Sequence, residues 1–377
     1  MPDDPLLDLS RYRAALGEWL EATPAILAPV LAPSPIYAER VAAMRAFMAE
    51  LHSAGWSRYG WPTAVGGLGG SILHRGSMWE ALARRGVAGM AVFEHLEVLA
   101  PTLVEFGPTE FVAEALPDFL AGRKVWSQGF SEPGAGSDLA NLRTTATAID
   151  DGFVVTGNKI WTSWSKYADW CLVLARTGTP ESRHRGLTAL VVDLSAPGVE
   201  VRPIVQANGT DELAEVFFDE VHAPASRMLG QPGDGWKVAM HILSHERGTL
   251  AWFRHLFFHQ QLRDCAGDAD PRHDAALGNA LLDLAAVGAT AHEGLVQHAR
   301  GEPLGPHAAF TKLLMCESEQ ALNDWILAVD PDLAAGVQTP EVAMRRQEYL
   351  FSRIVTVYGG SQQMQLDTIA KQILHLP

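Results

Sequence analysis

The sequence predicts an α+β protein with an N-terminal helical domain, a small middle β-barrel or sandwich domain and a C-terminal four-helix bundle. Three successive segments with different spacing of apolar residues indicate this order. The spacing is helical up to about Leu120, alternates between about Val125 and Met228, and is helical again from Asp234. We therefore predict domains at residues 1–124, 125–229 and 230–377 of the 377-residue chain.

The first domain begins with helical patterns. Val41, Met44, Met48 and Leu51 recur three and four residues apart, which places them on one face of a helix. Between residues 60 and 70, five glycines and a proline rule out a continuous helix.

Short strands are predicted in the middle domain. Phe153 and Val155 lie two residues apart, as on one face of a strand, and residues 187–194 form a run rich in β-branched and other apolar side chains. Turn pairs such as Asp151-Gly152 separate these segments. Several short strands at this spacing favour a small β-barrel or sandwich.

The last domain shows four helices with apolar stripes, as a helical bundle requires. We expect the last of them to run from Val342 to Tyr358, to stop at Gly359-Gly360 and to resume as far as Leu374.

Composition excludes several classes of function. The chain has 44 acidic and 29 basic residues and a net charge of −15, which disfavours nucleic-acid binding. Its three cysteines lie far apart and form no disulfide framework. No apolar run reaches the roughly 18 residues of a membrane span, and the acidic first residues are unlike a signal peptide. We expect a cytoplasmic protein without membrane insertion.

Three clusters point to chemistry. The first, residues 128–139, has glycines at 134 and 136 that allow a ligand close to the backbone, although a turn into the β-domain has the same pattern. In the second, Trp161 is either a core residue or stacks on a planar cofactor with Ser163 beside it. The third, residues 358–365, is a glycine break that alone predicts a helix end and a new helix start.

Together these clusters resemble the acyl-CoA dehydrogenase family, from about Gly55 to Leu374. The segments Gly60-Trp61-Pro62 and 245–248 (His-Glu-Arg-Gly) fit the resemblance as well. It implies FAD held between the β-domain and the bundle, and FAD-dependent α,β-dehydrogenation of an acyl-CoA thioester.

The resemblance also implies roles for individual residues. By similarity, the flavin is bound at six positions: Phe130, Ser131, Trp161, Ser163, Ser361 and Gln363. Ser137, Arg247 and Gly359 match positions near the substrate, with Arg247 near the CoA ribose or phosphates. A solvated helix-face arginine is the alternative for Arg247.

Many family members carry their catalytic glutamate at the position that is Gly359 here. Glu246 matches a second known location of that base, on the first long bundle helix. It follows Leu243 and Ile242 by three and four residues, so it projects from an apolar face where burial raises a carboxyl pKa. A structural ion pair is the alternative role for Glu246.

Gly359 keeps the backbone N–H with which the family polarises the thioester carbonyl. A glycine also removes a side chain from the floor of the acyl pocket. We therefore expect a branched or bulky acyl group.

One departure concerns assembly. The Arg-x-x-Phe-Gly segment that grips the FAD of a neighbouring subunit has no counterpart between Trp252 and Leu281. Through the bundle we expect a homo- or hetero-oligomer, and electron-transferring flavoprotein as electron acceptor. The alternatives are an oxygen-using acyl-CoA oxidase or flavin monooxygenase, and a flavin-poor partner subunit.

No metal is expected. His255 and His259 lie four residues apart near Cys265, but without a third ligand nearby they favour a packed or solvated helix face.

Overall fold

The computed structural model describes residues 4–88, 91–247, 249–266 and 271–376. The chain forms two compact units. One, here called the helical unit, comprises Met1–Thr63, Gly67–Glu94 and Ser244–Pro377, and the other, the β-unit, comprises Ala64–Gly66 and His95–Leu243. Helices from both ends of the chain therefore belong to the same unit.

The N-terminal part of the helical unit has four helices, and α1 packs on α4 while α2 packs on α3. Their bounds are α1 Leu9–Ala22, α2 Pro24–Leu31, α3 Tyr37–Ser53 and α4 Ile72–Ala83. The predicted stripe of Val41, Met44, Met48 and Leu51 is buried on α3. Between Trp56 and Val65 the chain has short 3₁₀ turns and an isolated β-bridge from Trp61 to Gly69, with no α-helix, as the glycines of this stretch predict.

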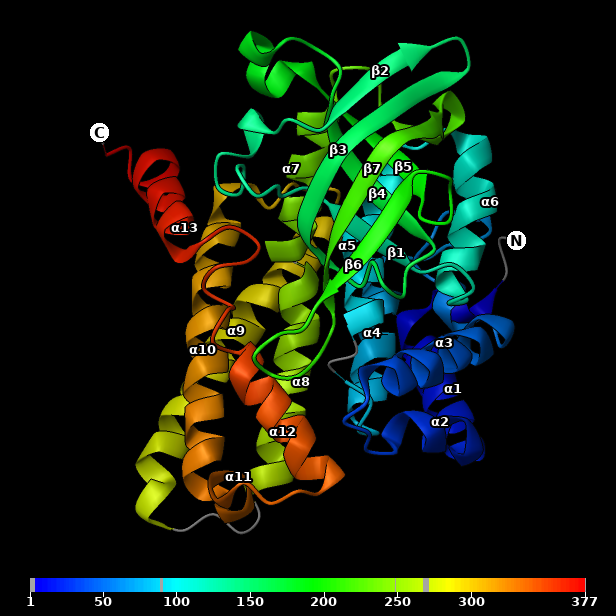
Figure 1. Cartoon of the computed structure of the whole chain (residues 1–377). Helices are drawn as coiled ribbons and strands as arrows, with labels where there is room; N and C mark the ends of the chain where they lie inside the picture. The colour runs from blue at the N-terminus through cyan, green and yellow to red at the C-terminus, as the bar shows by residue number, and fades with distance from the viewer. Residues whose placement is uncertain (1–3, 89–90, 248, 267–270, 377) are drawn as a thin grey trace. The chain divides into compact units, whose positions relative to one another are not determined.

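The C-terminal helices are α8 Thr249–Ala266, α9 Asp274–Ala299, α10 Ala308–Val329, α11 Pro331–Ala335, α12 Pro340–Phe351 and α13 Gln362–Thr368. α9 packs against both α8 and α10, as Figure 1 shows, and α12 packs on α10. Phe258, Leu284, Leu322 and Trp325 are buried in the core between these helices. A π-helical turn, Ile369–Ile373, follows α13.

The α12 helix ends earlier than predicted. It stops at Phe351, because the last α-helical bond runs from the Ser352 N–H to the Glu348 carbonyl. The N–H groups of Arg353 and Ile354 then bond only three residues back, to the carbonyls of Leu350 and Phe351 at 3.3 and 3.0 Å. Residues from Ser352 to Gly360 form turns instead of the expected helix to Tyr358.

The β-unit has one eight-stranded sheet in the order β6-β7-β3-β2-β4-β5-β8, with β1 paired to β4. Figure 1 shows β6, β7 and β3 side by side in this sheet. The strands are β1 Trp126–Gly129, β2 Thr145–Ile149, β3 Gly152–Ser163, β4 Trp170–Arg176, β5 Leu187–Asp193, β6 Val199–Ile204, β7 Leu213–Pro224 and β8 Met228–Leu229. The helix α6 Thr109–Leu120 belongs to this unit, while α5 Ala91–Phe106 and α7 Gly235–Arg247 cross the border between the units. The predicted run 187–194 is confirmed as β5.

Apolar side chains from alternating strand positions build the core of the β-unit. Phe153, Val155, Val173 and Val216 are among its buried members. The order of helices, mixed sheet and C-terminal helices confirms the predicted fold class.

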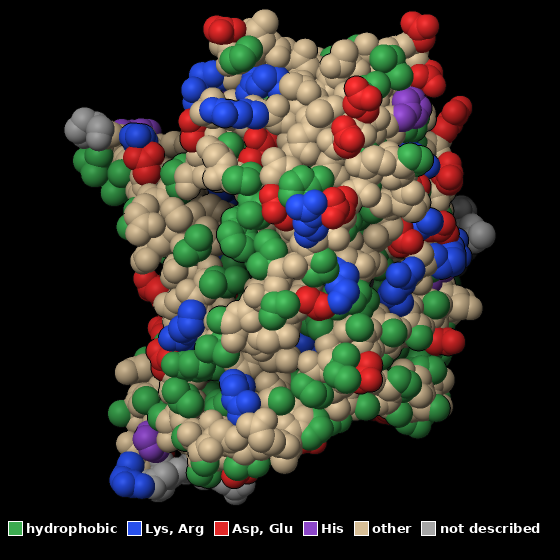
Figure 2. Space-filling model, viewed as in Figure 1, with side chains coloured by type: hydrophobic (Ala, Val, Ile, Leu, Met, Phe, Trp, Pro, Cys, Tyr) green, Lys and Arg blue, Asp and Glu red, His purple; other side chains and the backbone are tan. Residues whose placement is uncertain are grey.

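Acidic side chains are spread over the face shown in Figure 2, as the net charge of −15 implies. Within the described ranges, no helix combines the length and the apolar character of a membrane span.

Candidate active site

Two predicted flavin positions lie directly after β1, beside β3. The Ser131 carbonyl accepts from the backbone N–H of Ile160 at 2.9 Å, and the Phe130 carbonyl accepts from Lys159 Nζ at 3.1 Å. Phe130 and Ser131 therefore lie beside Lys159 and Ile160, which directly precede Trp161 near the end of β3. The structure brings four predicted residues together in the β-unit: Phe130, Ser131, Trp161 and Ser163.

A buried ion pair holds this loop. Lys159 Nζ lies 2.8 Å from Glu132 Oε1, and the carboxylate also accepts from the backbone N–H groups of Arg143 and Thr144 at 2.6 and 2.8 Å. Burial alone raises the pKa of Glu132, but the charge and hydrogen bonds of Lys159 outweigh this and hold that pKa below its usual value. The pair thus fixes the chain on both sides of Ser131.

Trp161 has two unusual properties for a strand tryptophan. Its indole is 57% exposed, and its backbone has a φ of 61° at a bulge in the pairing of β3 with β7. A left-handed backbone costs a bulky residue free energy, and such strain gathers at functional sites. An exposed aromatic face in a fixed position suits stacking on a planar cofactor, as predicted for Trp161.

The glycines of the first cluster are not required by packing within the chain. A Cβ added at Gly134 or Gly136 meets no atom within 4 Å, and neither glycine has a positive φ. Open space above two glycines suits close approach of a ligand. Ser137 is exposed beside them, and its neighbour Asp138 pairs with Arg183 at 2.8 Å.

In the helical unit, the Glu246 carboxylate lies next to Gly359, where the side chain of a larger residue would stand. A Cβ built on Gly359 falls 2.5 Å from Glu246 Oε1, so any larger residue there requires the carboxylate to move. Gly359 also has a φ of 64°, a conformation that favours glycine. The predicted base and the predicted substrate glycine are therefore direct neighbours.

The surroundings of Glu246 change its acidity. Burial raises the pKa of its carboxyl, and the charges of Lys312 and Arg247 act in the opposite direction. A raised carboxyl pKa suits a general base that works near neutral pH.

Hydrogen bonds to backbone carbonyls hold the turn at Gly359-Gly360, here called the glycine turn. Arg247 Nε donates to the Gly359 carbonyl at 3.3 Å, and Gln365 Nε2 donates to the Gly360 carbonyl at 3.1 Å. Arg247 thus supports the turn beside Glu246, a role that is compatible with a further contact to CoA.

The two remaining flavin positions start α13. The Ser361 hydroxyl caps this helix by accepting from the backbone N–H of Met364 at 3.4 Å, and Gln363 is exposed. Ser361 and Gln363 belong to the helical unit with Glu246, whereas the four positions around β1 and β3 belong to the β-unit.

Lys312 and Gln365 were missed in the sequence. Both are almost fully buried, at 2% and 1% exposure, and both lie next to the glycine turn. A signal existed for Lys312, since Ala309, Met315 and Cys316 lie three and four residues away and place it on the apolar face of a helix.

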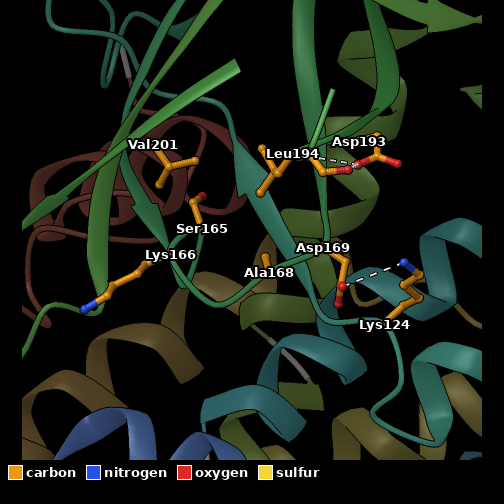
Figure 3. Close-up of a pocket in the computed structure, with 9 residues that line it drawn as sticks. Lys124, Ser165, Lys166, Ala168, Asp169, Asp193, Leu194 and Val201 are labelled. Carbon is orange, nitrogen blue, oxygen red and sulfur yellow. Dashed lines mark hydrogen bonds and ion pairs between the residues drawn. The ribbon is translucent and has the colours of Figure 1, made fainter. Parts of the chain in front are cut away.

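A polar hollow of about 320 Å³ lies elsewhere in the β-unit, lined by Lys124, Ser165, Lys166, Ala168, Asp169, Asp193, Leu194, Ser195 and Val201 (Figure 3). Lys124 pairs with Asp169 and Lys166 pairs with Asp211, so both cations are neutralised within the protein. None of the predicted site residues lines it. In the described part of the chain no three His, Cys, Asp or Glu side chains are grouped as a metal site.

Known proteins match the chain over nearly its whole length. Family profiles match residues 19–123 as an acyl-CoA dehydrogenase N-terminal domain, 127–221 as the middle domain and 233–374 as the C-terminal domain. Acyl-CoA dehydrogenase IpdE1 of Mycobacterium tuberculosis is 38% identical over 88% of this chain and 88% of its own length. IpdE1 of Mycolicibacterium smegmatis is 34% identical over 99% of both chains.

A solved structure shows the same fold. The structure described as "Tcur3481-Tcur3483 steroid ACAD" superposes with a TM-score of 0.80 at 28% identity, covering 98% of this chain and 97% of its own. Members of this family are flavoproteins. From its three matching domains and its relatives, this chain belongs to the acyl-CoA dehydrogenase family and is an acyl-CoA dehydrogenase.

Proposed function

We propose that this enzyme dehydrogenates an acyl-CoA thioester between the α and β carbons, with Glu246 as the base that removes the α-proton. One observation carries the assignment of the base. The Glu246 carboxylate lies beside Gly359, with Oε1 2.5 Å from the point where a Cβ at that position stands. In family members that carry the base at the position of Gly359, the carboxylate comes from that turn. In this chain, Glu246 brings a carboxylate to the same region from α7.

The α-proton of a thioester is weakly acidic, so the reaction needs two contributions from the protein. Glu246 accepts the proton, and its raised pKa improves the match to that weak acid. We assign the backbone N–H of Gly359 to the thioester carbonyl, where a donor stabilises the developing enolate.

We assign FAD binding to Phe130, Ser131, Trp161 and Ser163 in the β-unit and to Ser361 and Gln363 in the helical unit. The exposed, strained Trp161 fits a planar ring, and the open glycines at 134 and 136 fit a ligand near the backbone. When bound, the flavin supplies the acceptor for the β-hydrogen as hydride. Ser137 and Arg247 are assigned to the CoA part of the substrate.

We propose a branched or bulky acyl group, but the structure does not support the reason for it that the sequence suggested, a pocket widened at Gly359. The space beside Gly359 is taken by the Glu246 carboxylate, so the missing side chain does not by itself widen the acyl pocket. The support comes instead from the relative described as a steroid ACAD, which suggests a polycyclic acyl group.

The description of the same relative names two proteins, Tcur3481 and Tcur3483, which supports a hetero-oligomer for this chain. Electron-transferring flavoprotein is the electron acceptor that we propose, and we place the enzyme in the cytoplasm.

The test is purification with a visible spectrum, followed by turnover on straight, branched and polycyclic acyl-CoA substrates. We expect bound flavin, best turnover on the bulky substrates and slow reoxidation in air. Best turnover on straight medium chains contradicts the substrate class. Rapid peroxide formation identifies an oxidase, and a protein that binds no added FAD identifies a partner subunit.

A further inference from the structure

A buried lysine that no predicted role uses lies next to the proposed base. Lys312, on α10, is only 2% exposed, and its Nζ has no hydrogen-bond partner among the described residues. An ammonium group in such a place is costly unless another group offsets its charge. A charged ammonium group at this position therefore needs a compensating interaction nearby.

The position of Nζ identifies the neighbours. A Cβ built on Gly359 lies 3.5 Å from Lys312 Nζ and 2.5 Å from Glu246 Oε1, so both atoms border the same small space. Nζ also lies 4.1 Å from the centre of the Tyr358 ring, which offers a weaker cation–π attraction.

Other charges around this space do not offset Lys312. Arg247 is a second cation on the Glu246 side, and its Nε donates to the Gly359 carbonyl. Glu319, two helical turns along α10, is paired with Arg254 at 2.6 Å. The Cys316 thiol is engaged with the Val355 carbonyl at 2.9 Å. Burial raises its pKa more than the nearby charge of Lys312 lowers it, so the thiol is a neutral neighbour. Of the described acidic side chains around this space, Glu246 is the one left without such a partner cation.

We propose that Lys312 is a positioning residue for the base, whose ammonium group holds the Glu246 carboxylate ionised and directed towards Gly359. This inference rests on the proposed function only in calling Glu246 the base. Without Lys312, Arg247 is the remaining described cation that acts on the buried Glu246 carboxylate, so the carboxylate takes up a proton at higher pH.

The test is the titration of the Glu246 carboxyl, which does not depend on turnover. Infrared difference spectra between pH values, with those of Glu246→Gln subtracted, isolate the carboxylic-acid C=O band of this one residue. In Lys312→Met we expect the midpoint of that band to rise by about 1–3 pH units, the usual effect of losing an opposite charge at short range. Lys312→Gln is the second neutral variant and should show the same rise.

Two controls separate charge from structure. Lys312→Arg keeps the cation and should titrate close to the wild type. Lys371→Met removes an exposed lysine, paired with Asp367 near the C-terminus, and should leave the midpoint unchanged. In active enzyme, the acid limb of kcat/KM should move upward with the carboxyl in the neutral variants only.

An unchanged Glu246 midpoint in folded Lys312→Met or Lys312→Gln overturns the inference. So does a change in KM alone, which assigns Lys312 to the acyl group, or an equal shift in Lys312→Arg. The proposed function fails separately, when Glu246→Gln turns over normally, and the infrared titration still reports on the Lys312–Glu246 pair in that case.

Discussion

The carboxylate of Glu246 and the backbone of Gly359 share one space, with Oε1 2.5 Å from the missing Cβ. The two residues are far apart in sequence, and the next residue of α7, Arg247, ties the helix to the Gly359 carbonyl at 3.3 Å. A glutamate on α7 and a glycine in the turn are therefore a matched pair. A change at either residue affects the other.

Gly359→Ala tests this pairing. The new methyl group meets the carboxylate, so we expect the rate of flavin reduction to fall by at least about tenfold, the loss that follows from a misplaced base. Rapid-mixing absorbance measurements give the rate, and the spectrum reports whether flavin is still bound.

Gly336→Ala is the matched control. Gly336 has a similar φ of 69°, but an added Cβ meets nothing closer than Arg346 Nη2 at 3.9 Å. Both substitutions cost about 1–2 kcal/mol of backbone strain, and only the first should slow the reaction. An equal loss of rate in both variants shows that strain, not the carboxylate, is responsible.

Trp161→Gly separates stability from cofactor binding. Glycine accepts the φ of 61° without strain and the exposed indole has little packing to lose, so the free energy of unfolding of apoprotein should change by at most about 1 kcal/mol. FAD affinity, measured by equilibrium titration, should fall clearly because the stacking surface is lost.

Trp164→Gly is the comparison, and we expect it to lower the free energy of unfolding strongly. Trp164 has the same φ of 61° but is 4% exposed and lies edge-on to His95 at 4.6 Å. Its loss should cost about 3–5 kcal/mol of stability through the cavity it leaves. Unchanged FAD affinity in Trp161→Gly contradicts its assignment to the flavin.

Lys159→Met tests the buried ion pair between Lys159 and Glu132, which lies beside the proposed flavin position Ser131. It leaves the Glu132 carboxylate buried without its cation, so we expect a loss of about 3–5 kcal/mol in urea unfolding. Since the folded-state pKa of Glu132 is depressed, its contribution to wild-type stability is present above the unfolded pKa and is lost as pH falls through the folded pKa. Lys159→Met should flatten this acid dependence.

Lys166→Met serves as its control, since Lys166 pairs with Asp211 at a 40% exposed position. The expected cost is within about 1 kcal/mol, as for most surface pairs. Equal losses in the two variants contradict a special role for the buried pair.

The fold was predictable because apolar spacing reports local structure. Spacing placed the buried stripe of α3 and the strand β5 correctly. It overestimated α12 beyond Phe351, where the apolar residues Val355 and Val357 continue the pattern but the backbone changes to turns with hydrogen bonds three residues back. It says nothing about tertiary partners, and so gave no sign that the N-terminal and C-terminal helices form one unit.

The site was predictable to a lesser degree. The position of Glu246 on an apolar helix face anticipated a desolvated carboxylate. It did not show that this carboxylate takes the space beside Gly359. Lys312 and Gln365 are polar residues on buried helix faces, and the sequence shows such a residue without showing what it faces. Their importance depends on contacts between separate segments, with Gln365 Nε2 3.1 Å from the Gly360 carbonyl.

The pH dependence follows from the base. Glu246 acts when ionised, and burial raises its pKa, so activity should fall as pH decreases through a midpoint above the ordinary carboxyl value of about 4.3. A profile of kcat/KM against pH measures this midpoint for the free enzyme. If kcat/KM does not change with pH above the ordinary carboxyl pKa, a buried carboxylate is not the base.

The most direct test of the account is single-turnover flavin reduction by a saturating acyl-CoA substrate in Glu246→Gln. The amide keeps the size and contacts of the carboxylate but accepts no proton, so the rate of flavin bleaching should fall by about 10²–10⁴ while flavin content and substrate affinity stay near those of the wild type. Bleaching at the wild-type rate in that variant would show that another group removes the α-proton.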